Sequence, residues 1–435
     1  MESPACNNQK KVLVAMSGGV DSSVAAALLV REGWDVVGVF MRLGSPGESL
    51  DSLTPYDSAG VSCDPAKVKI GHQGCCSIND AADARLVAAE LGIPLYVCNF
   101  KKDFGRIIDY FVDEYAEGRT PNPCVRCNDW LKFGKLHEYA KQIGATHVAS
   151  GHYARIDHSH ADGPRLLRGV DSSKDQSYVL FGASRARLSE MLLPIGGYEK
   201  PRVREMAEEF GLPTFDKPDS QEICFVPDNN YAGLVERKRP ELVGEGEILD
   251  EDGKVVGTHK GQHHFTIGQR RGTGVALGYP IYVVNKDPRT NTVTVGSEQQ
   301  LLSTHAAVNE ANWLSAPSPF MGEGGWRAFS RQPGEGLPDW FPCLARYRYN
   351  GVAVPAECRL TRGTGFQPVE DRPPTTGKMP VPQPDAPPTP SGRTGTFEVR
   401  FDEPQRAVAP GQAMVLYDAE VPDLVLGGGW IVGAE

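Results

Sequence analysis

The 435-residue sequence has no long hydrophobic run and no excess of basic residues. A transmembrane helix needs roughly 18 or more consecutive apolar residues, so the missing run excludes a helical membrane span. Residues 1–11 lack the apolar core of a secretory signal, and we therefore expect a cytoplasmic protein. In that reducing compartment the ten cysteines are better explained as thiols, metal ligands or catalytic groups than as a disulfide framework.

The net charge of −10 argues against a uniformly basic surface of the kind that binds nucleic-acid phosphates. Three local clusters of basic residues remain within this average, at residues 237–239, 269–271 and 346–349. Such a cluster is more often a solvated surface than a binding site. Composition alone therefore leaves the partner undetermined.

The first part of the chain, residues 1–197, alternates between strand and helix patterns. Apolar strand patterns lie at residues 11–16, 35–41, 95–100 and 146–154, and helix patterns lie at residues 21–32, 78–91, 104–117 and 129–142. Strands separated by helices need crossover connections and form a parallel sheet with helices on both faces. We therefore expect a doubly wound α/β domain that binds its ligand at the carboxyl ends of the strands.

Two further domains are expected after this one. Residues 198–278 contain one helix pattern, at 201–210, and then irregular Gly-rich sequence, which we interpret as a connecting domain. Residues 279–435 contain short alternating strands, including "IYVVNKDPRTNTVTVG", "FEVRFDEP" and "QAMVLYDAE", that indicate a small antiparallel β-barrel. Within the barrel, residues 363–395 are dense in Pro, Gly and Thr, and we expect them to be a disordered insertion.

The strongest local motif is "SGGVDSS", residues 17–23, which lies directly between an expected strand and an expected helix. Small residues let backbone amides approach a phosphate, and the helix N-terminus adds the positive end of its dipole. Ser17, Ser22 and Ser23 offer hydroxyl groups, while Asp21 could hold Mg²⁺. The motif lacks the Gly-Lys-Ser/Thr ending of a Walker A loop. It resembles the PP-loop family of ATP pyrophosphatases, which implies the fold and the ATP cofactor but not the substrate.

Three cysteines discriminate among PP-loop enzymes. Cys124 and Cys127 form a CxxC pair in "GRTPNPCVRCNDWLKFG", just before an expected helix whose N-terminus favours the thiolate. A CxxC pair alone is compatible with redox chemistry, zinc binding or cluster ligation. Cys224 in "PDSQEICFVPD", taken alone, is more simply an inert buried thiol. A PP-loop synthetase that forms an amide would need none of the three.

Seven motifs together resemble one family, the bacterial tRNA-specific 2-thiouridylases. They occur in the family's order as "AMSGGVDSS", "RTPNPCVRCN", "SGHYAR", "KDQSYVL", "SQEICFV", "GQHHFTIGQRRG" and "PGQAMVLY", and the similarity covers nearly the whole chain apart from insertions. The resemblance implies 2-thiolation of the wobble uridine of tRNA. ATP adenylates the base oxygen and releases pyrophosphate, sulfur then displaces AMP, and the base must be flipped out of its stack to be reached.

The resemblance also implies roles for individual residues. Cys127 is the catalytic nucleophile, and Cys224 carries sulfur as a persulfide that a relay protein or a cysteine desulfurase supplies. Release of that sulfur leaves a Cys127–Cys224 disulfide for a reductant to reopen. ATP is expected at Ala15, Met16, Ser17, Gly18, Gly19, Val20, Asp21, Ser22, Met41 and Gly151. Contacts with tRNA are expected at Asn122, Pro123, Cys124, His152, Lys174, Asp175, Gln176, Arg346, Tyr347 and Gln412.

One departure from the family leaves the mechanism open. Some members carry Asp at the position of Cys124, where the carboxylate can accept a proton. With a thiol there, Cys124, Cys127 and Cys224 could instead hold three irons of a [4Fe-4S] cluster and leave the fourth iron to bind sulfide. A further alternative is a non-enzymatic RNA-binding or cluster-carrying scaffold, which would release no pyrophosphate from ATP.

Overall fold

The computed structural model describes residues 10–43, 78–219, 223–226, 230–318, 339–361 and 395–435. Its first unit is a five-stranded parallel sheet in the order β3-β2-β1-β4-β7. The strands are β1 (Lys11–Ala15), β2 (Asp35–Arg42), β3 (Leu95–Asn99), β4 (His147–Ser150) and β7 (Met191–Leu192). The expected parallel sheet is therefore confirmed.

Helices cover both faces of this sheet, because successive side chains of a strand point to opposite sides. The helices are α1 (Val20–Arg31), α2 (Ile78–Glu90), α3 (Lys101–Ala116), α5 (Leu136–Gln142) and α7 (Lys200–Glu209). Val12 and Val14 of β1 share one core with α1, α2 and α7. Leu13 and Ala15 share the other core with α3 and α5. This two-sided burial is the doubly wound arrangement that the sequence predicts.

The helix expected at residues 129–142 begins earlier and is wound differently. α4 (Pro123–Arg126) leads into a π-helix, η2 (Cys127–Lys135), which continues as α5. In a π-helix each N–H bonds to the carbonyl five residues earlier, and such turns are rare and frequently found at functional sites. A Cβ added to Gly134 would lie 2.6 Å from the Asp129 carbonyl oxygen, so this winding depends on glycine.

The strands at residues 282–296 lie outside the barrel in which we expected them. β10 (Tyr282–Asp287) pairs with β11 (Thr292–Gly296), β11 pairs with β8 (Gly246–Leu249), and β8 pairs with β9 (Val255–His259). The four strands enclose a hydrophobic core of their own. Alternation of apolar residues is the same in any half-buried sheet, so the sequence pattern could not assign these strands to the correct partner.

Six antiparallel strands close into a barrel in the order β12-β15-β14-β13-β16-β17. They are β12 (Leu302–Trp313), β13 (Phe341–Arg346), β14 (Val354–Leu360), β15 (Gly395–Arg406), β16 (Ala413–Asp418) and β17 (Val425–Ala434). Closure leaves no strand edge unpaired, and the interior is filled by side chains. Of the insertion expected at residues 363–395, residues 363–394 lie outside the described residues, whereas Gly395 is the first residue of β15.

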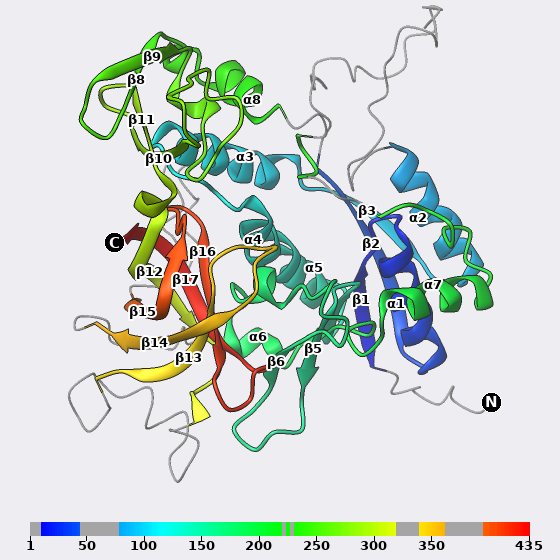
Figure 1. The fold of residues 1–435 in the computed structure, drawn as a ribbon. Coiled ribbons are helices and arrows are strands. Elements are labelled where there is room, and N and C mark those ends of the chain that lie inside the picture. Colours follow the sequence, from blue (N-terminus) through cyan, green and yellow to red (C-terminus); the bar gives the residue numbers. More distant parts are fainter. Residues whose placement is uncertain (1–9, 44–77, 220–222, 227–229, 319–338, 362–394) are drawn as a thin grey trace, which may run out of the picture.

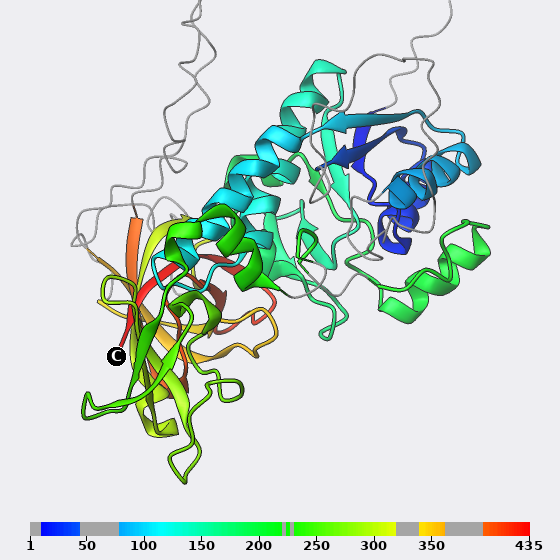
Figure 2. The same ribbon diagram turned by 90° about the horizontal axis from the view of Figure 1, so that it is seen from above.

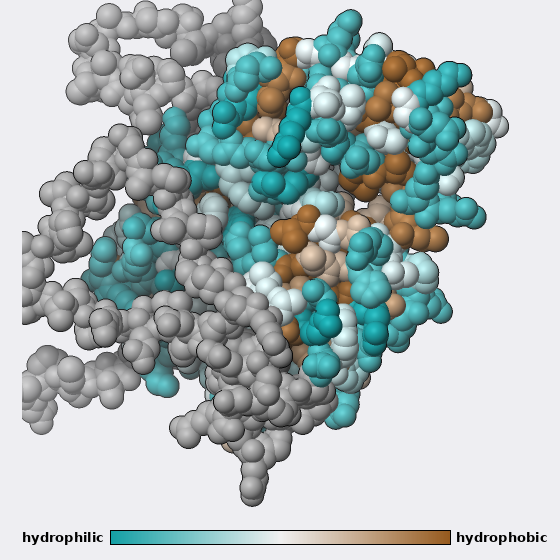
Figure 3. Space-filling view, turned by 90° about the vertical axis from the view of Figure 1, so that its left-hand side faces the viewer, coloured by the Kyte–Doolittle hydropathy of each residue, from teal (hydrophilic) through white to brown (hydrophobic). Residues whose placement is uncertain are grey.

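The parallel sheet and the barrel lie at opposite ends of the molecule, with α3, α4 and α5 between them (Figure 1). The four-stranded sheet lies beside α3, which is also visible from above in Figure 2. On the side shown in Figure 3, hydrophilic residues are interspersed with small hydrophobic patches. None of the helices in the described ranges combines the length and apolarity needed to cross a bilayer.

Candidate active site

The loop between β1 and α1 is drawn together by its own polar groups. The Ser17 N–H donates to Ser22 Oγ at 3.1 Å, and Ser22 Oγ donates to the Gly19 carbonyl at 3.2 Å. Gly18 has a φ of +72° and lies so close to the Asp80 carbonyl that a Cβ would not fit. The loop therefore presents its backbone N–H groups at the N-terminus of α1, which is a geometry that binds phosphate.

The other expected nucleotide residues lie at the same edge of the sheet. Gly151 directly follows β4, and a Cβ there would lie 2.6 Å from both Asp21 C and Ser22 N, so only glycine allows this approach. Met41 lies near the end of β2 and is half-buried. Since β1, β2 and β4 are parallel neighbours, their carboxyl ends meet. The structure thus gathers the loop, Met41 and Gly151 at one place.

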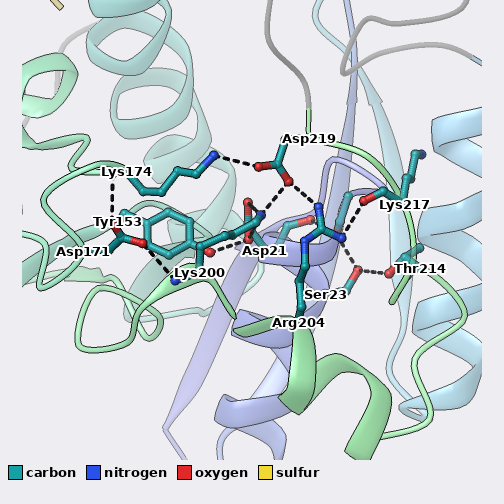
Figure 4. A network of polar contacts seen from close by, with 12 residues as sticks. Asp21, Ser23, Tyr153, Asp171, Lys174, Lys200, Arg204, Thr214, Lys217 and Asp219 are labelled. Atoms are coloured by element: carbon teal, nitrogen blue, oxygen red, sulfur yellow. Dashed lines mark hydrogen bonds and ion pairs between the residues drawn. The ribbon is translucent and has the colours of Figure 1, made fainter. Parts of the chain in front are cut away.

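Asp21 forms an ion pair with a lysine that the sequence analysis missed (Figure 4). Lys200 Nζ, in the first turn of α7, lies 2.8 Å and 2.9 Å from the two carboxylate oxygens of Asp21. The Tyr153 hydroxyl donates to Asp21 Oδ1 at 2.7 Å. Burial, and then the Asp21 carboxylate, raise the pKa of Tyr153, so its phenol keeps the proton that it donates.

Asp219 joins three cations beside this pair (Figure 4). Its carboxylate lies 2.8 Å from Lys200 Nζ, 2.9 Å from Lys174 Nζ and 2.7 Å from an Arg204 nitrogen. Burial opposes ionisation of Asp219, but hydrogen bonds from Lys200 and Lys174 outweigh it and lower the pKa of the carboxyl to about 2. A weak sequence signal existed, because residues 200 and 204 lie four apart on one helix face.

Lys217 adds a fourth cation on the other side of the loop. Its Nζ donates to the Gly18 carbonyl at 2.9 Å and lies 2.6 Å from Asp80 and 2.5 Å from Asp83. Lys217 is far from the loop in sequence, so no local motif predicts the contact. Cationic side chains therefore lie on both sides of the phosphate loop, and each of them forms an ion pair with a carboxylate.

The structure places two of the three candidate cysteines at one hydrophobic core. Cys127 and Cys224 are both half-buried and pack against the core that Ala15 and Leu13 enter. Cys124 is exposed on α4. Across the described ranges, the one group of three His, Cys, Asp or Glu ligand atoms within 4.8 Å of one another contains no cysteine.

Arg126, between the two cysteines of the CxxC pair, connects this segment to the barrel. It is buried and donates two hydrogen bonds to Glu310 of β12, at 2.9 Å and 3.0 Å. The guanidinium carbon lies 4.2 Å from the ring centroid of Trp430, 5.0 Å from that of Tyr110 and 5.2 Å from that of Trp130. Sequence reasoning missed this ion pair because its two partners are distant in the chain.

Two of the expected tRNA residues, Asp175 and Arg346, form an ion pair with each other. Asp175 is buried, and it accepts hydrogen bonds from the Gly169 N–H at 3.0 Å and from Ser177 Oγ at 3.0 Å. An Arg346 nitrogen at the end of β13 donates to it at 2.9 Å. This contact joins the barrel to the parallel-sheet domain. Asp175 is buried and Arg346 is half-buried in this contact.

His152 is also buried, between a serine and a lysine. Its Nδ1 lies 2.6 Å from Ser150 Oγ, and its Nε2 lies 3.4 Å from Lys132 Nζ of the π-helix. Burial, and then the charge on Lys132, lower the pKa of His152, so the imidazole is neutral. His152 is therefore a buried, neutral side chain in the described structure.

The remaining expected tRNA residues come from the CxxC segment, the loop around Lys174 and the barrel, and Lys174 belongs to the Asp219 network. Gln412 donates to the Thr120 carbonyl at 2.9 Å, at the start of the CxxC segment. The Tyr347 hydroxyl donates to Gln405 at 3.2 Å. Pro123 is buried, whereas the half-buried members of the set are Asn122, Lys174, Gln176, Tyr347 and Gln412.

Comparison with known proteins agrees with these features. Residues 10–228 match a family model described as a tRNA methyl transferase HUP domain, residues 234–297 match a tRNA methyl transferase PRC-barrel domain, and residues 383–431 match an aminomethyltransferase beta-barrel domain. A tRNA-specific 2-thiouridylase MnmA from Rhodopirellula baltica is 44% identical, and the match covers 98% of this chain and 96% of that protein. One from Carboxydothermus hydrogenoformans is 42% identical over 97% of this chain and 98% of that protein.

The chain belongs to the tRNA-specific 2-thiouridylase family. The resemblance inferred from the seven motifs is thereby confirmed. Although the family models mention methyl transfer, these full-length relatives are named as thiouridylases. A solved 4-thiouridine synthetase–RNA complex with bound ATP matches at 16% identity, over 53% of this chain and 51% of that chain, with a TM-score of 0.32, which is too low to carry an argument.

Proposed function

We propose that this chain catalyses the ATP-dependent 2-thiolation of the wobble uridine of tRNA, with Cys127 and Cys224 as its reacting groups. The observation that carries the proposal is that nucleotide and thiol features border one core. Ala15, which enters the phosphate loop, is part of the hydrophobic core against which Met41, Cys127 and Cys224 pack. Activation of a base oxygen and delivery of sulfur would then take place at features that share this core.

The phosphate loop would bind the ATP phosphates through its backbone N–H groups. Asp21 would hold Mg²⁺ together with phosphate oxygens, which is the oxygen-rich ligand set that this ion prefers. Lys200 would then exchange the Asp21 carboxylate for a phosphate, and Arg204 and Lys217 lie where they can do the same. These contacts would stabilise the charge that develops as pyrophosphate leaves and the uridine oxygen becomes bonded to AMP.

The thiol chemistry would proceed through a persulfide on Cys224, which a relay protein or a cysteine desulfurase supplies. Its terminal sulfur attacks the adenylated C2, the C–O bond breaks, and AMP leaves with the former base oxygen. The Cys127 thiolate then attacks the Cys224 sulfur, so that 2-thiouridine is released and a Cys127–Cys224 disulfide forms. An external thiol reductant reopens that disulfide. The half-burial of both sulfurs at one core supports this route.

A [4Fe-4S] cluster on Cys124, Cys127 and Cys224 is the second route. Three thiolates satisfy the ligand chemistry of such a cluster and would leave one iron open. The exposure of Cys124, against the half-burial of the other two, supports the two-cysteine route instead. Iron and sulfide assay of anaerobically purified protein, with the activity of Cys124→Ser, separates the two. Iron-free protein with an active variant would leave only the persulfide route.

For tRNA, we propose direct contact by the accessible members of the expected set and positioning by the buried ones. Cys124 is exposed, while Asn122, Lys174, Tyr347 and Gln412 are half-buried. Pro123 and Gln176 would shape the same surface. His152, Asp175 and Arg346 are held by internal hydrogen bonds and would position their neighbours.

The decisive experiment supplies the chain with ATP, unmodified tRNA, and a cysteine desulfurase with cysteine. We expect pyrophosphate release and 2-thiouridine in the tRNA, measured by mass spectrometry of its nucleosides. Cys224→Ser should abolish 2-thiouridine, whereas Cys98→Ser should retain it, because Cys98 is a half-buried thiol at the same core without an assigned role. Pyrophosphate release without any 2-thiouridine would indicate a different PP-loop reaction.

A further inference from the structure

Two adjacent histidines and a glutamate meet in the central domain, away from the thiolation site. Glu236 lies in α8 (Tyr231–Lys238), and His263 and His264 lie in the short helix η5 (Gln262–His264). His264 Nε2 is 3.0 Å from Glu236 Oε1, and His263 Nε2 is 3.5 Å from the same oxygen. No step of the proposed thiolation uses these three residues.

The separations between these atoms fit a tetrahedral metal ion. Zinc bonds to histidine nitrogen and carboxylate oxygen at about 2.0–2.2 Å, so two ligands of a tetrahedral ion lie about 3.3 Å apart. The observed 3.0 Å and 3.5 Å lie on either side of that value. All three ligand atoms lie within 4.8 Å of one another, so small side-chain rotations would complete the geometry.

The burial of the three side chains suits a site with one open position. The His263 side chain is 1% exposed, whereas those of His264 and Glu236 are 36% and 35% exposed. An ion would therefore rest on a buried imidazole and be reached from solvent past the other two ligands. Both imidazoles currently compete for one carboxylate oxygen, and His263 Nδ1 has no hydrogen-bond partner in the described part of the chain.

We propose that Glu236, His263 and His264 bind a divalent transition-metal ion of the zinc class, with water in the fourth position. Two imidazoles and one carboxylate favour such an ion over Mg²⁺ or Ca²⁺, which prefer oxygen ligands. The ion would fasten α8 to η5. Because α8 follows closely after the segment that carries Cys224, the ion would also fix the point from which that segment extends.

Titration with Co²⁺, after treatment with a chelator, tests this proposal and distinguishes the ligands. Histidine and carboxylate ligation gives visible d–d absorption, and thiolate ligation adds an intense near-ultraviolet charge-transfer band. We expect one Co²⁺ per chain without the thiolate band, displaced by Zn²⁺. Glu236→Gln and His264→Asn should each weaken binding by more than about 100-fold, because each removes a direct ligand. Both side chains are partly exposed, so the variants should fold.

Glu241→Gln is the matched control, since Glu241 is an exposed acid in the same region that lies outside the cluster. It should bind Co²⁺ as the unaltered chain does. Zn²⁺ should raise the melting temperature of the unaltered chain and of this control but not of the two ligand variants. Binding that Glu236→Gln and His264→Asn leave unchanged, or a spectrum with thiolate absorption alone, would overturn the proposal.

Discussion

The nucleotide end and the cysteine end of the candidate site are held by different kinds of ion pair. At the nucleotide end, Lys200 and Asp219 belong to a chain of contacts whose acids are 24% to 33% exposed. At the cysteine end, the side chains of Arg126 and Glu310 are 6% and 20% exposed, and aromatic rings surround the guanidinium. The acids of the first network are the more exposed, and aromatic rings shield the cation of the second.

This difference indicates two separate tasks. A pair whose acid is partly exposed costs less to open, so we expect the carboxylates to be exchanged for phosphates as a nucleotide binds. A buried pair costs several kcal/mol when only one partner is removed, because the other charge stays uncompensated. The ion pairs at the nucleotide end thus suit exchange of a carboxylate for a phosphate. The Arg126–Glu310 pair suits a fixed attachment of the CxxC segment to the barrel.

The largest effect should come from Asp21→Asn, which removes the carboxylate proposed to hold Mg²⁺. We expect pyrophosphate release to fall at least about 100-fold, because stabilisation of the developing charge is lost. The melting temperature should change little, since Lys200 keeps its contact with Asp219. Asp83→Asn is the control, because Lys217 retains Asp80 in that variant. Normal pyrophosphate release by Asp21→Asn would remove the phosphate-loop assignment.

Breaking the buried pair should instead reduce stability. Arg126→Met and Glu310→Leu should each lower the free energy of unfolding by about 3 kcal/mol, and the double variant by less than the sum. Denaturant unfolding measures this, and alkylation of Cys127 should become faster as α4 loosens. Arg400→Met removes one partner of an exposed pair in the same barrel and should cost less than about 1 kcal/mol. Equal costs at the two pairs would contradict the comparison.

A smaller, pH-dependent effect is expected at His152. Burial, followed by the charge on Lys132, holds the pKa of this side chain below its ordinary value of 6.5. The contribution of His152 to the free energy of unfolding is therefore complete above pH 6.5 and declines as the pH falls below it. The reason is that His152 takes up a proton in the unfolded chain but stays neutral in the folded chain. The slope is at most about 1.4 kcal/mol per pH unit. His152→Gln should flatten the slope of the unfolding free energy, and His158→Gln, at an exposed site, should leave it unchanged.

The smallest effect should follow replacement of residues 363–394 by a short Gly/Ser turn. Leu360 pairs with Phe397, and the Thr361 N–H donates to the Thr396 carbonyl at 3.3 Å, so the flanking strands are already adjacent. We expect thiolation to stay within about twofold, because a short turn can close these strands. A large loss of activity, with the melting temperature unchanged, would show that the segment contacts tRNA or a partner.

Features that depend on neighbouring residues could be predicted from the sequence. The loop at Ser17–Ser23 combines a strand end, two glycines and a helix start within one short segment, and the structure builds it as expected. Lys200 and Asp219 could not be predicted in the same way, since only tertiary packing brings α7 and the following loop to Asp21. The contact between Glu310 and Arg126 of the CxxC segment could not be predicted either, because it too arises only from tertiary packing.

Burial was the second limit of the sequence prediction. Polar residues in a motif are ordinarily expected at a surface, but His152 and Asp175 each satisfy their hydrogen bonds inside the protein. Arg346 similarly forms an ion pair with Asp175 inside the protein. The local sequence does not show that a residue of another domain will form a hydrogen bond or ion pair with such a side chain.

The π-helix gives the spacing after Cys127 a meaning of its own. Because its hydrogen bonds join residues five apart, Lys132 lies one turn along the helix from Cys127. If the same residues wound as an α-helix instead, in which each residue advances by about 100°, Cys127 and Lys132 would be separated by more than a full turn. The thiol would then point to a different side while α5 stayed in place. The π winding of this interval, which Gly134 permits, therefore sets the direction of the sulfur.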